Sequence, residues 1–150
     1  MNKAQIITIL QQAKPDHIEW VKQAHKIISD APKDEISKPI ACNDCLFGKW
    51  QKKEGYKLVN IPQIKELEAL HKEVHDLYTV LYYTTFDRRK TPRAMVISKG
   101  IEIPIKERKF RVKKLKLLEK KTVTLVRSLA FIEKKVESMS NSDFLSPWLS

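Results

Sequence analysis

Four histidines and two cysteines are the residues of this chain that could bind a transition-metal ion. His71 and His75 are four residues apart, so on a helix they would share one face, about 40° from each other. Such a pair can offer two imidazoles to one ion. A structural zinc site needs four protein ligands, whereas a catalytic site uses three and keeps a position for water. The candidates for the remaining ligands are His17, His25, Cys42 and Cys45.

The elements that position these side chains are expected to be helices. The chain has 150 residues, only three glycines, and seven prolines that punctuate longer stretches. So few glycines argue against phosphate-binding glycine-rich loops and against many-stranded β folds. We predict an all-α fold, an antiparallel helical bundle with a long C-terminal amphipathic helix. The expected helices cover about residues 3–30, 40–53, 62–86 and 105–139.

The helix faces indicate which histidines point inward. In the first expected helix, His17 lies on the same side as Trp20 and Val21, which predicts a position in the core. His25 lies about 80° around the helix and is expected at the rim of the core. Pro15 should either bend this helix or begin a new one. Gly48 is unusual inside an expected helix and suggests the close approach of a neighbouring helix or of a metal ion.

The last expected helix carries an apolar seam whose residues are three and four positions apart. This spacing is typical of a coiled coil that joins two chains, and equally of a helix packed along its own bundle. The sequence leaves both interpretations open. The seam consists of Leu115, Leu118, Thr122, Leu125, Leu129, Ile132, Val136 and Met139.

The net charge of +11 lies entirely in one segment, residues 88–121, and the rest of the chain is neutral. Clustered lysines and arginines can bind nucleic acid by releasing counterions from its phosphates. They can equally contact an acidic protein or an anionic lipid surface. Phe110 is the only aromatic residue of the segment, so no platform for stacking bases is evident.

Three short motifs, taken together, resemble a known family. The chain has DHIEW with His17 and Trp20, then CLFGKW with Cys45, Gly48 and Trp50, and then LHKEVH. The chemoreceptor zinc-binding (CZB) domain family is marked by His-x-x-Trp, Cys-x-x-Gly-x-Trp and His-x-x-x-His in this order. The resemblance covers about residues 10–85.

The resemblance implies a function as well as a site. It implies zinc bound by His17, Cys45, His71 and His75 in a helical bundle that is usually a homodimer. It further implies a regulatory role, because these domains sense zinc or oxidants in bacterial chemoreceptors and diguanylate cyclases. Trp20 and Trp50 match the family's tryptophans and would close the shell around the ion. The chain carries neither a methyl-accepting signalling region nor a cyclase domain, so an output does not transfer with the resemblance.

Cys42 opens a rival ligand set, in which Cys42 and Cys45 bind zinc with His71 and His75. The 25 residues between the two pairs are far more than in a zinc finger, and this set leaves His17 unexplained. A zinc hydrolase is disfavoured, because three histidines and one cysteine would fill all four positions and no HExxH base is present.

We therefore predict a stand-alone regulatory zinc module and not an enzyme. Residues 1–90 would form the zinc-binding bundle, and residues 91–150 a basic linker and a helix that completes the bundle or a dimer interface. It would respond to zinc or to cysteine oxidation in a chemotaxis or cyclic-di-GMP pathway. No stretch is apolar enough to span a membrane, and we expect a cytoplasmic protein. The alternative is a nucleic-acid-binding protein with a structural zinc and the basic segment 88–121.

Overall fold

The computed structural model describes residues 2–86 and 104–140, the side chains of 104–106 excepted. The predicted all-α fold is confirmed: the described residues contain helices and no strand. Four α-helices, α1 (Lys3–Ile28), α2 (Leu46–Glu54), α3 (Ile64–Phe86) and α4 (Pro104–Ser138), are joined by two short 3₁₀-helices, η1 (Lys33–Glu35) and η2 (Gly55–Leu58). The linker expected at 91–104 lies outside the described residues, apart from Pro104, where α4 begins.

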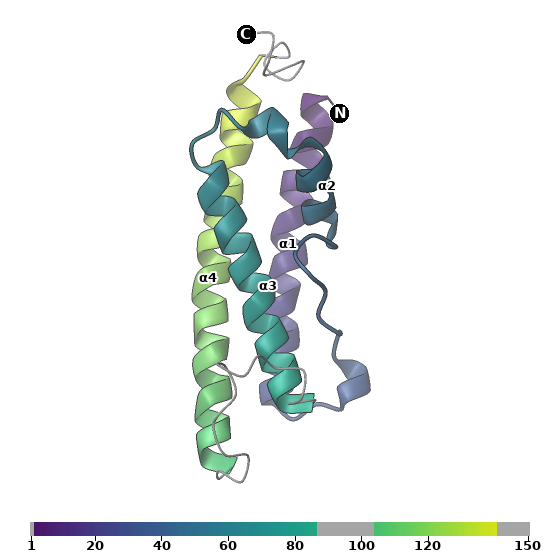
Figure 1. The fold of residues 1–150 in the computed structure, drawn as a ribbon, viewed down its shortest axis with the longest axis vertical. Helices are drawn as coiled ribbons and strands as arrows, with labels where there is room; N and C mark the ends of the chain where they lie inside the picture. Colours follow the sequence, from purple (N-terminus) through teal and green to yellow (C-terminus); the bar gives the residue numbers. More distant parts are fainter. Residues whose placement is uncertain (1, 87–103, 141–150) are drawn as a thin grey trace.

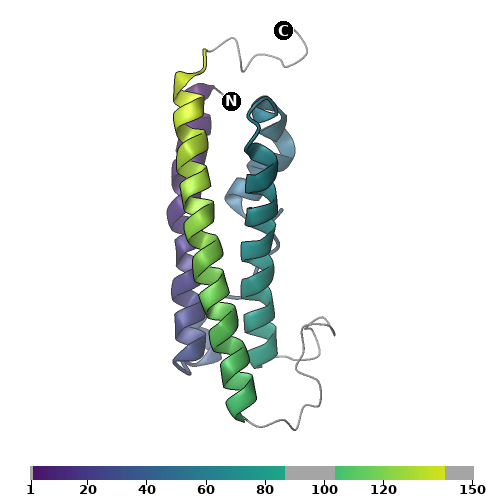
Figure 2. The ribbon, with the colours of Figure 1, turned by 90° about the vertical axis from the view of Figure 1, so that its left-hand side faces the viewer.

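The three long helices lie side by side, and the short α2 lies against α1 (Figure 1). The segment between α1 and α2 returns along the bundle, so α1 and α3 run in the same direction and α4 runs opposite to both. The helix α4 packs along α1 and also along α3 (Figure 2). The space between α1, α3 and the returning segment is where the site is found.

The helix α1 passes through Pro15 without ending. Its start is fixed by a capping box, in which Asn2 and Gln5 bond each other's backbone N–H groups. Its buried side chains recur every three or four residues along one face, which explains why the helix packs as a single rod. They include Ile6, Leu10, Ala13, His17, Ala24 and Ile27.

The seam of α4 is buried within the chain. Its seven residues from Leu115 to Val136 are at most 6% exposed, and Met139 is half-buried. They face α1 and α3, so the spacing reflects a helix packed along its own bundle. The seam is therefore not available for a coiled coil with a second chain.

The helix expected at 40–53 begins later than the sequence pattern indicated. Residues 42–44 form a turn and Cys45 is the N-cap of α2, which starts at Leu46. Asn43 and Asp44 favour such a turn, because their short polar side chains compete with helical hydrogen bonds. Cys42 is thus not one helical turn before Cys45.

None of the described helices is long and apolar enough to cross a membrane.

Candidate metal centre

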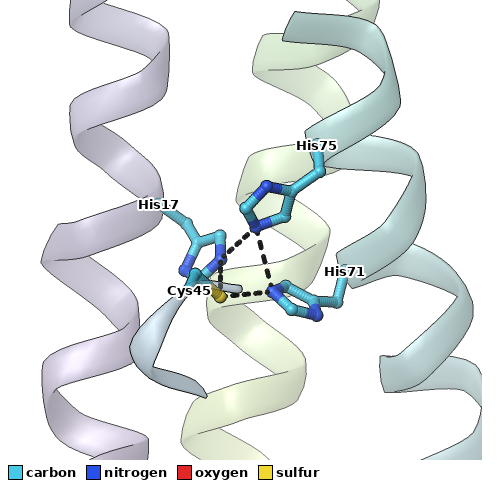
Figure 3. Close-up of side chains that lie close together, drawn as sticks. All are labelled: His17, Cys45, His71 and His75. Atoms are coloured by element: carbon cyan, nitrogen blue, oxygen red, sulfur yellow. Dashed lines mark hydrogen bonds between the residues drawn. The ribbon is translucent and has the colours of Figure 1, made fainter. Parts of the chain in front are cut away.

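Four side chains from three segments of the chain converge in the interior of the bundle. His17 comes from α1, Cys45 from the N-cap of α2, and His71 and His75 from adjacent turns of α3. One potential ligand atom of each lies within 4.8 Å of all the others. Figure 3 shows the three imidazoles and the sulfur pointing toward one another.

The separations between these atoms fit a tetrahedral zinc ion. The Nε2 atom of His75 lies 3.2 Å from that of His17 and 3.1 Å from that of His71. The Cys45 Sγ atom lies 3.2 Å from His71 Nε2 and 4.0 Å from His17 Nε2. Ordinary zinc bond lengths place two nitrogen ligands about 3.3 Å apart, and a nitrogen and a sulfur about 3.6 Å apart.

The outer nitrogens of two histidines determine which inner nitrogens carry lone pairs. His17 Nδ1 lies 2.6 Å from the carbonyl oxygen of Ala13, and His75 Nδ1 lies 2.9 Å from that of Ile40. A carbonyl only accepts hydrogen bonds, so both Nδ1 atoms carry the proton and donate it. In the neutral rings each of the two Nε2 atoms is then unprotonated and carries a lone pair, and these two lone pairs face each other. A cation between them satisfies both, and this is how histidine ligands of zinc are commonly oriented.

Cys45 is held by the first turn of α2. Its Sγ atom accepts a hydrogen bond of 3.3 Å from the backbone N–H of Gly48, as an N-cap side chain does. Burial raises the pKa of the Cys45 thiol, and the N–H groups of Gly48 and Phe47 act in the opposite direction. The N–H groups at the start of α2 therefore favour the thiolate that a metal requires. Without a metal, their effect is smaller than that of burial, and the pKa of the thiol stays raised.

Burial keeps the three histidines neutral. They are between 1% and 3% exposed. Desolvation and the neighbouring imidazoles lower the pKa of His71 to about 3, and desolvation lowers that of His75 to about 4. Desolvation also lowers the pKa of His17. At neutral pH all three imidazoles therefore have a lone pair ready for an ion.

Aromatic side chains enclose the centre. Phe47 meets the His71 ring edge to face at 5.0 Å, and Trp20 lies 6.1 Å from the His75 ring. Trp50 packs against Phe47, with the ring centroids 5.8 Å apart. Of the two tryptophans expected to close the shell, Trp20 thus contacts a histidine ring directly, whereas Trp50 contacts Phe47, which in turn contacts His71.

The structure does not bring the other two candidates into the cluster. His25 is on the surface, 56% exposed, with Nε2 2.7 Å from Glu119. Cys42 is half-buried, and its Sγ atom lies 3.9 Å from the amide oxygen of Asn43. Both cysteines are free thiols in the structure. It is the backbone of Cys42 that contacts the centre, with its carbonyl oxygen 3.4 Å from Cys45 Sγ.

Sequence reasoning missed three contributors to the centre. The carbonyl groups of Ala13 and Ile40 carry no signal in the residue type, because any residue offers the same acceptor. Ala13 could have been suggested by its position, four residues before His17 and one helical turn away. Phe47 is signalled only by its place two residues after Cys45.

A helical bundle that encloses three histidines and one cysteine belongs to the class of helical metal-binding domains. Residues 17–80 match the family model of the chemoreceptor zinc-binding domain. This match confirms the resemblance seen in the sequence motifs and, together with the cluster of four ligand atoms, the predicted zinc cofactor. Comparison with curated proteins and with solved structures gives no match.

Zinc binding is expected to release about one proton per ion near neutral pH, and the proton comes from Cys45. The lowered pKa values of the histidines mean that they have none to release, whereas the raised pKa of Cys45 means that its thiol must ionise. Affinity should therefore rise about tenfold per pH unit between roughly pH 6 and 8. Titration calorimetry in buffers of different ionisation enthalpy counts the protons, and a count near three or near zero would contradict this.

Proposed function

We propose that this protein is a regulatory module whose signal is the state of a zinc ion bound by His17, Cys45, His71 and His75. The observation that carries the proposal is the convergence of four buried ligand atoms, none farther than 4.8 Å from another. Four protein ligands leave no position for a water nucleophile, which favours a structural or sensory ion over a hydrolytic one.

Cobalt substitution tests the ligand set directly. Cobalt(II) in a tetrahedral site with one thiolate and three imidazoles gives visible ligand-field bands and one sulfur-to-metal charge-transfer band in the near ultraviolet. We expect one equivalent of cobalt or zinc per chain, and loss of the charge-transfer band in Cys45→Ser. The band should persist in Cys42→Ser. If it vanished in Cys42→Ser instead, the rival ligand set would be correct.

We further propose that oxidation of Cys45 releases the ion. A peroxide oxidises the Cys45 thiolate to sulfenic acid by transferring one oxygen atom and is itself reduced to water or alcohol. The Cys42 thiol can then attack that sulfur, forming the Cys42–Cys45 disulfide and releasing water. This step is supported by the position of both cysteines before α2, so that no helical turn needs to unwind.

The oxidation proposal predicts that peroxide releases zinc from the loaded protein in a reaction that a thiol reductant reverses. Mass spectrometry should find the Cys42–Cys45 disulfide, and a zinc-binding dye should report the ion. In Cys42→Ala, release should persist, but recovery should be poor because the sulfenic acid oxidises further. Zinc that stays bound while only Cys42 is modified would overturn the proposal.

Two finer points complete the proposed function. We expect a homodimer, as the family resemblance implies, but through a surface other than the buried seam of α4. We also expect the output to act through a separate signalling protein of a chemotaxis or cyclic-di-GMP pathway. Light scattering of the zinc-loaded protein tests the first point, and a monomer at micromolar concentration would contradict it.

A further inference from the structure

The helix α4 presents a line of cations on the side opposite its buried seam. The residues of this cationic stripe recur at helical spacing, and all of them are exposed. At 1.5 Å per residue the stripe is about 38 Å long. It consists of Lys109, Lys113, Lys116, Lys120, Arg127 and Lys134.

The acidic residues of α4 lie away from this stripe. At 100° per residue, each of them is about 80° or more from the middle of the stripe. Two are used at the border with α1, where Glu119 pairs with His25 and Glu133 pairs with Lys14 at 3.3 Å. Within residues 107–138 the outward stripe therefore contains no acidic residue.

Apolar side chains stand between the cations. Val123 lies on the stripe and is 50% exposed, and Phe131 lies on it and is 43% exposed. Lys135 places its ammonium group 5.4 Å from the centre of the Phe131 ring. Exposure of the apolar Val123 and Phe131 side chains to water is unfavourable. A partner surface that offers both negative charge and hydrocarbon would suit the cationic stripe better.

We propose that the cationic stripe docks on an anionic lipid membrane, with the axis of α4 parallel to the surface. The helix α4 is unbroken over its length (Figure 2), and the six cations are exposed on one face of it, so a flat surface can reach all of them at once. Interspersed Val123 and Phe131 enter the headgroup region, as in helices that lie on membranes. Nucleic acid fits less well, because the cation of Lys135 lies over the Phe131 ring where a base would stack.

The cationic stripe differs from the basic segment 88–121 recognised in the sequence, because it includes two residues beyond that segment and leaves out some basic residues within it. Arg127 and Lys134 lie beyond residue 121 and join the stripe, whereas Lys121 is turned to α3 and pairs with Glu73 at 3.0 Å. The part of the basic segment at 88–103 lies outside the described residues. The proposal depends on the exposed face of α4 and not on the metal, so it stands or falls independently of the proposed function.

Sedimentation with lipid vesicles tests the proposal on the zinc-loaded full chain. Vesicles of phosphatidylcholine and phosphatidylglycerol should bind the protein, and vesicles of phosphatidylcholine alone should not. Each basic residue near an anionic surface contributes about fivefold to partitioning, so Lys113→Gln/Lys116→Gln/Lys120→Gln should weaken binding roughly 100-fold. A matched control, Lys22→Gln/Lys26→Gln/Lys65→Gln, removes the same charge from exposed positions of α1 and α3 and should weaken binding much less.

A second variant separates lipid from other polyanions. Val123→Ser/Phe131→Ser keeps every charge and changes only exposed positions, so it should weaken vesicle binding while the helical circular dichroism stays unchanged. Fluorescence anisotropy with random-sequence single- and double-stranded DNA provides the comparison. If the triple lysine variant of the stripe and its matched control lost vesicle binding equally, the proposal would be overturned. Binding to DNA but not to anionic vesicles would overturn it in favour of nucleic acid.

Discussion

Replacing His71 with alanine is expected to abolish zinc retention and to lower the melting temperature by about 10 °C or more. The Nε2 atom of His71 lies close to two other candidate ligand atoms, 3.1 Å from His75 Nε2 and 3.2 Å from Cys45 Sγ. Structural zinc can contribute on the order of 10 kcal/mol to the stability of the folded state. Losing even part of this free energy would destabilise the protein more than most single substitutions do. Metal analysis after gel filtration and a calorimetric scan measure the two quantities.

The chain supplies matched controls for this experiment. His25→Ala removes an exposed imidazole and its surface ion pair, so it should keep one zinc per chain and change stability by less than about 1 kcal/mol. His17→Ala should lose zinc and Cys42→Ala should keep it. Stoichiometric zinc in His71→Ala, with unchanged affinity, would show that the cluster is not the site.

Replacing Gly48 with alanine is expected to disrupt the centre without removing a ligand. A Cβ atom on Gly48 would overlap the carbonyl oxygen of Cys42, with its carbonyl carbon 2.7 Å and the Cα atom of Asn43 3.1 Å away. These are backbone atoms, so the 42–44 turn must move, and Cys45 moves with it. We expect zinc affinity to fall at least about tenfold and the free energy of unfolding to fall by about 1–3 kcal/mol, as for other overpacked sites.

Gly55→Ala is the control for the same change of residue. Its Cβ atom would meet only the flexible side chain of Gln51, at 3.1 and 3.7 Å, and its backbone is already in the right-handed helical region. Zinc affinity should be unchanged there, and stability should change by less than about 1 kcal/mol. Competition with a zinc chelator ranks the variants. If Gly48→Ala bound zinc as tightly as Gly55→Ala, the close contact with the turn would not matter.

The parts that were predictable from sequence are those governed by periodicity. The spacing of His17 from Trp20 and Val21 predicted an inward imidazole, and His17 is 1% exposed. The same argument placed His25 at the rim, where it is found. The sequence did not tell whether the seam of α4 packs against a second chain or within its own bundle. Both arrangements bury apolar residues that are three and four positions apart.

The parts that were not predictable depend on how the backbone of one segment meets another. Gly48 was interpreted as a sign of a neighbouring helix or of the metal, and the group that excludes a side chain there is instead the carbonyl of Cys42. The start of α2 at Leu46 and the capping role of Cys45 follow from the same turn. Residue types reveal little of such contacts, since every residue carries the same carbonyl group.

The position of α4 has a consequence for the order of folding during synthesis. All four candidate ligands precede residue 76, and they leave the ribosome well before the helix that covers the inner faces of α1 and α3. Until α4 emerges, the faces of α1 and α3 that pack against it lack their partner. Early zinc binding would hold the nascent α1, α2 and α3 together during this interval, when exposed apolar surface favours aggregation.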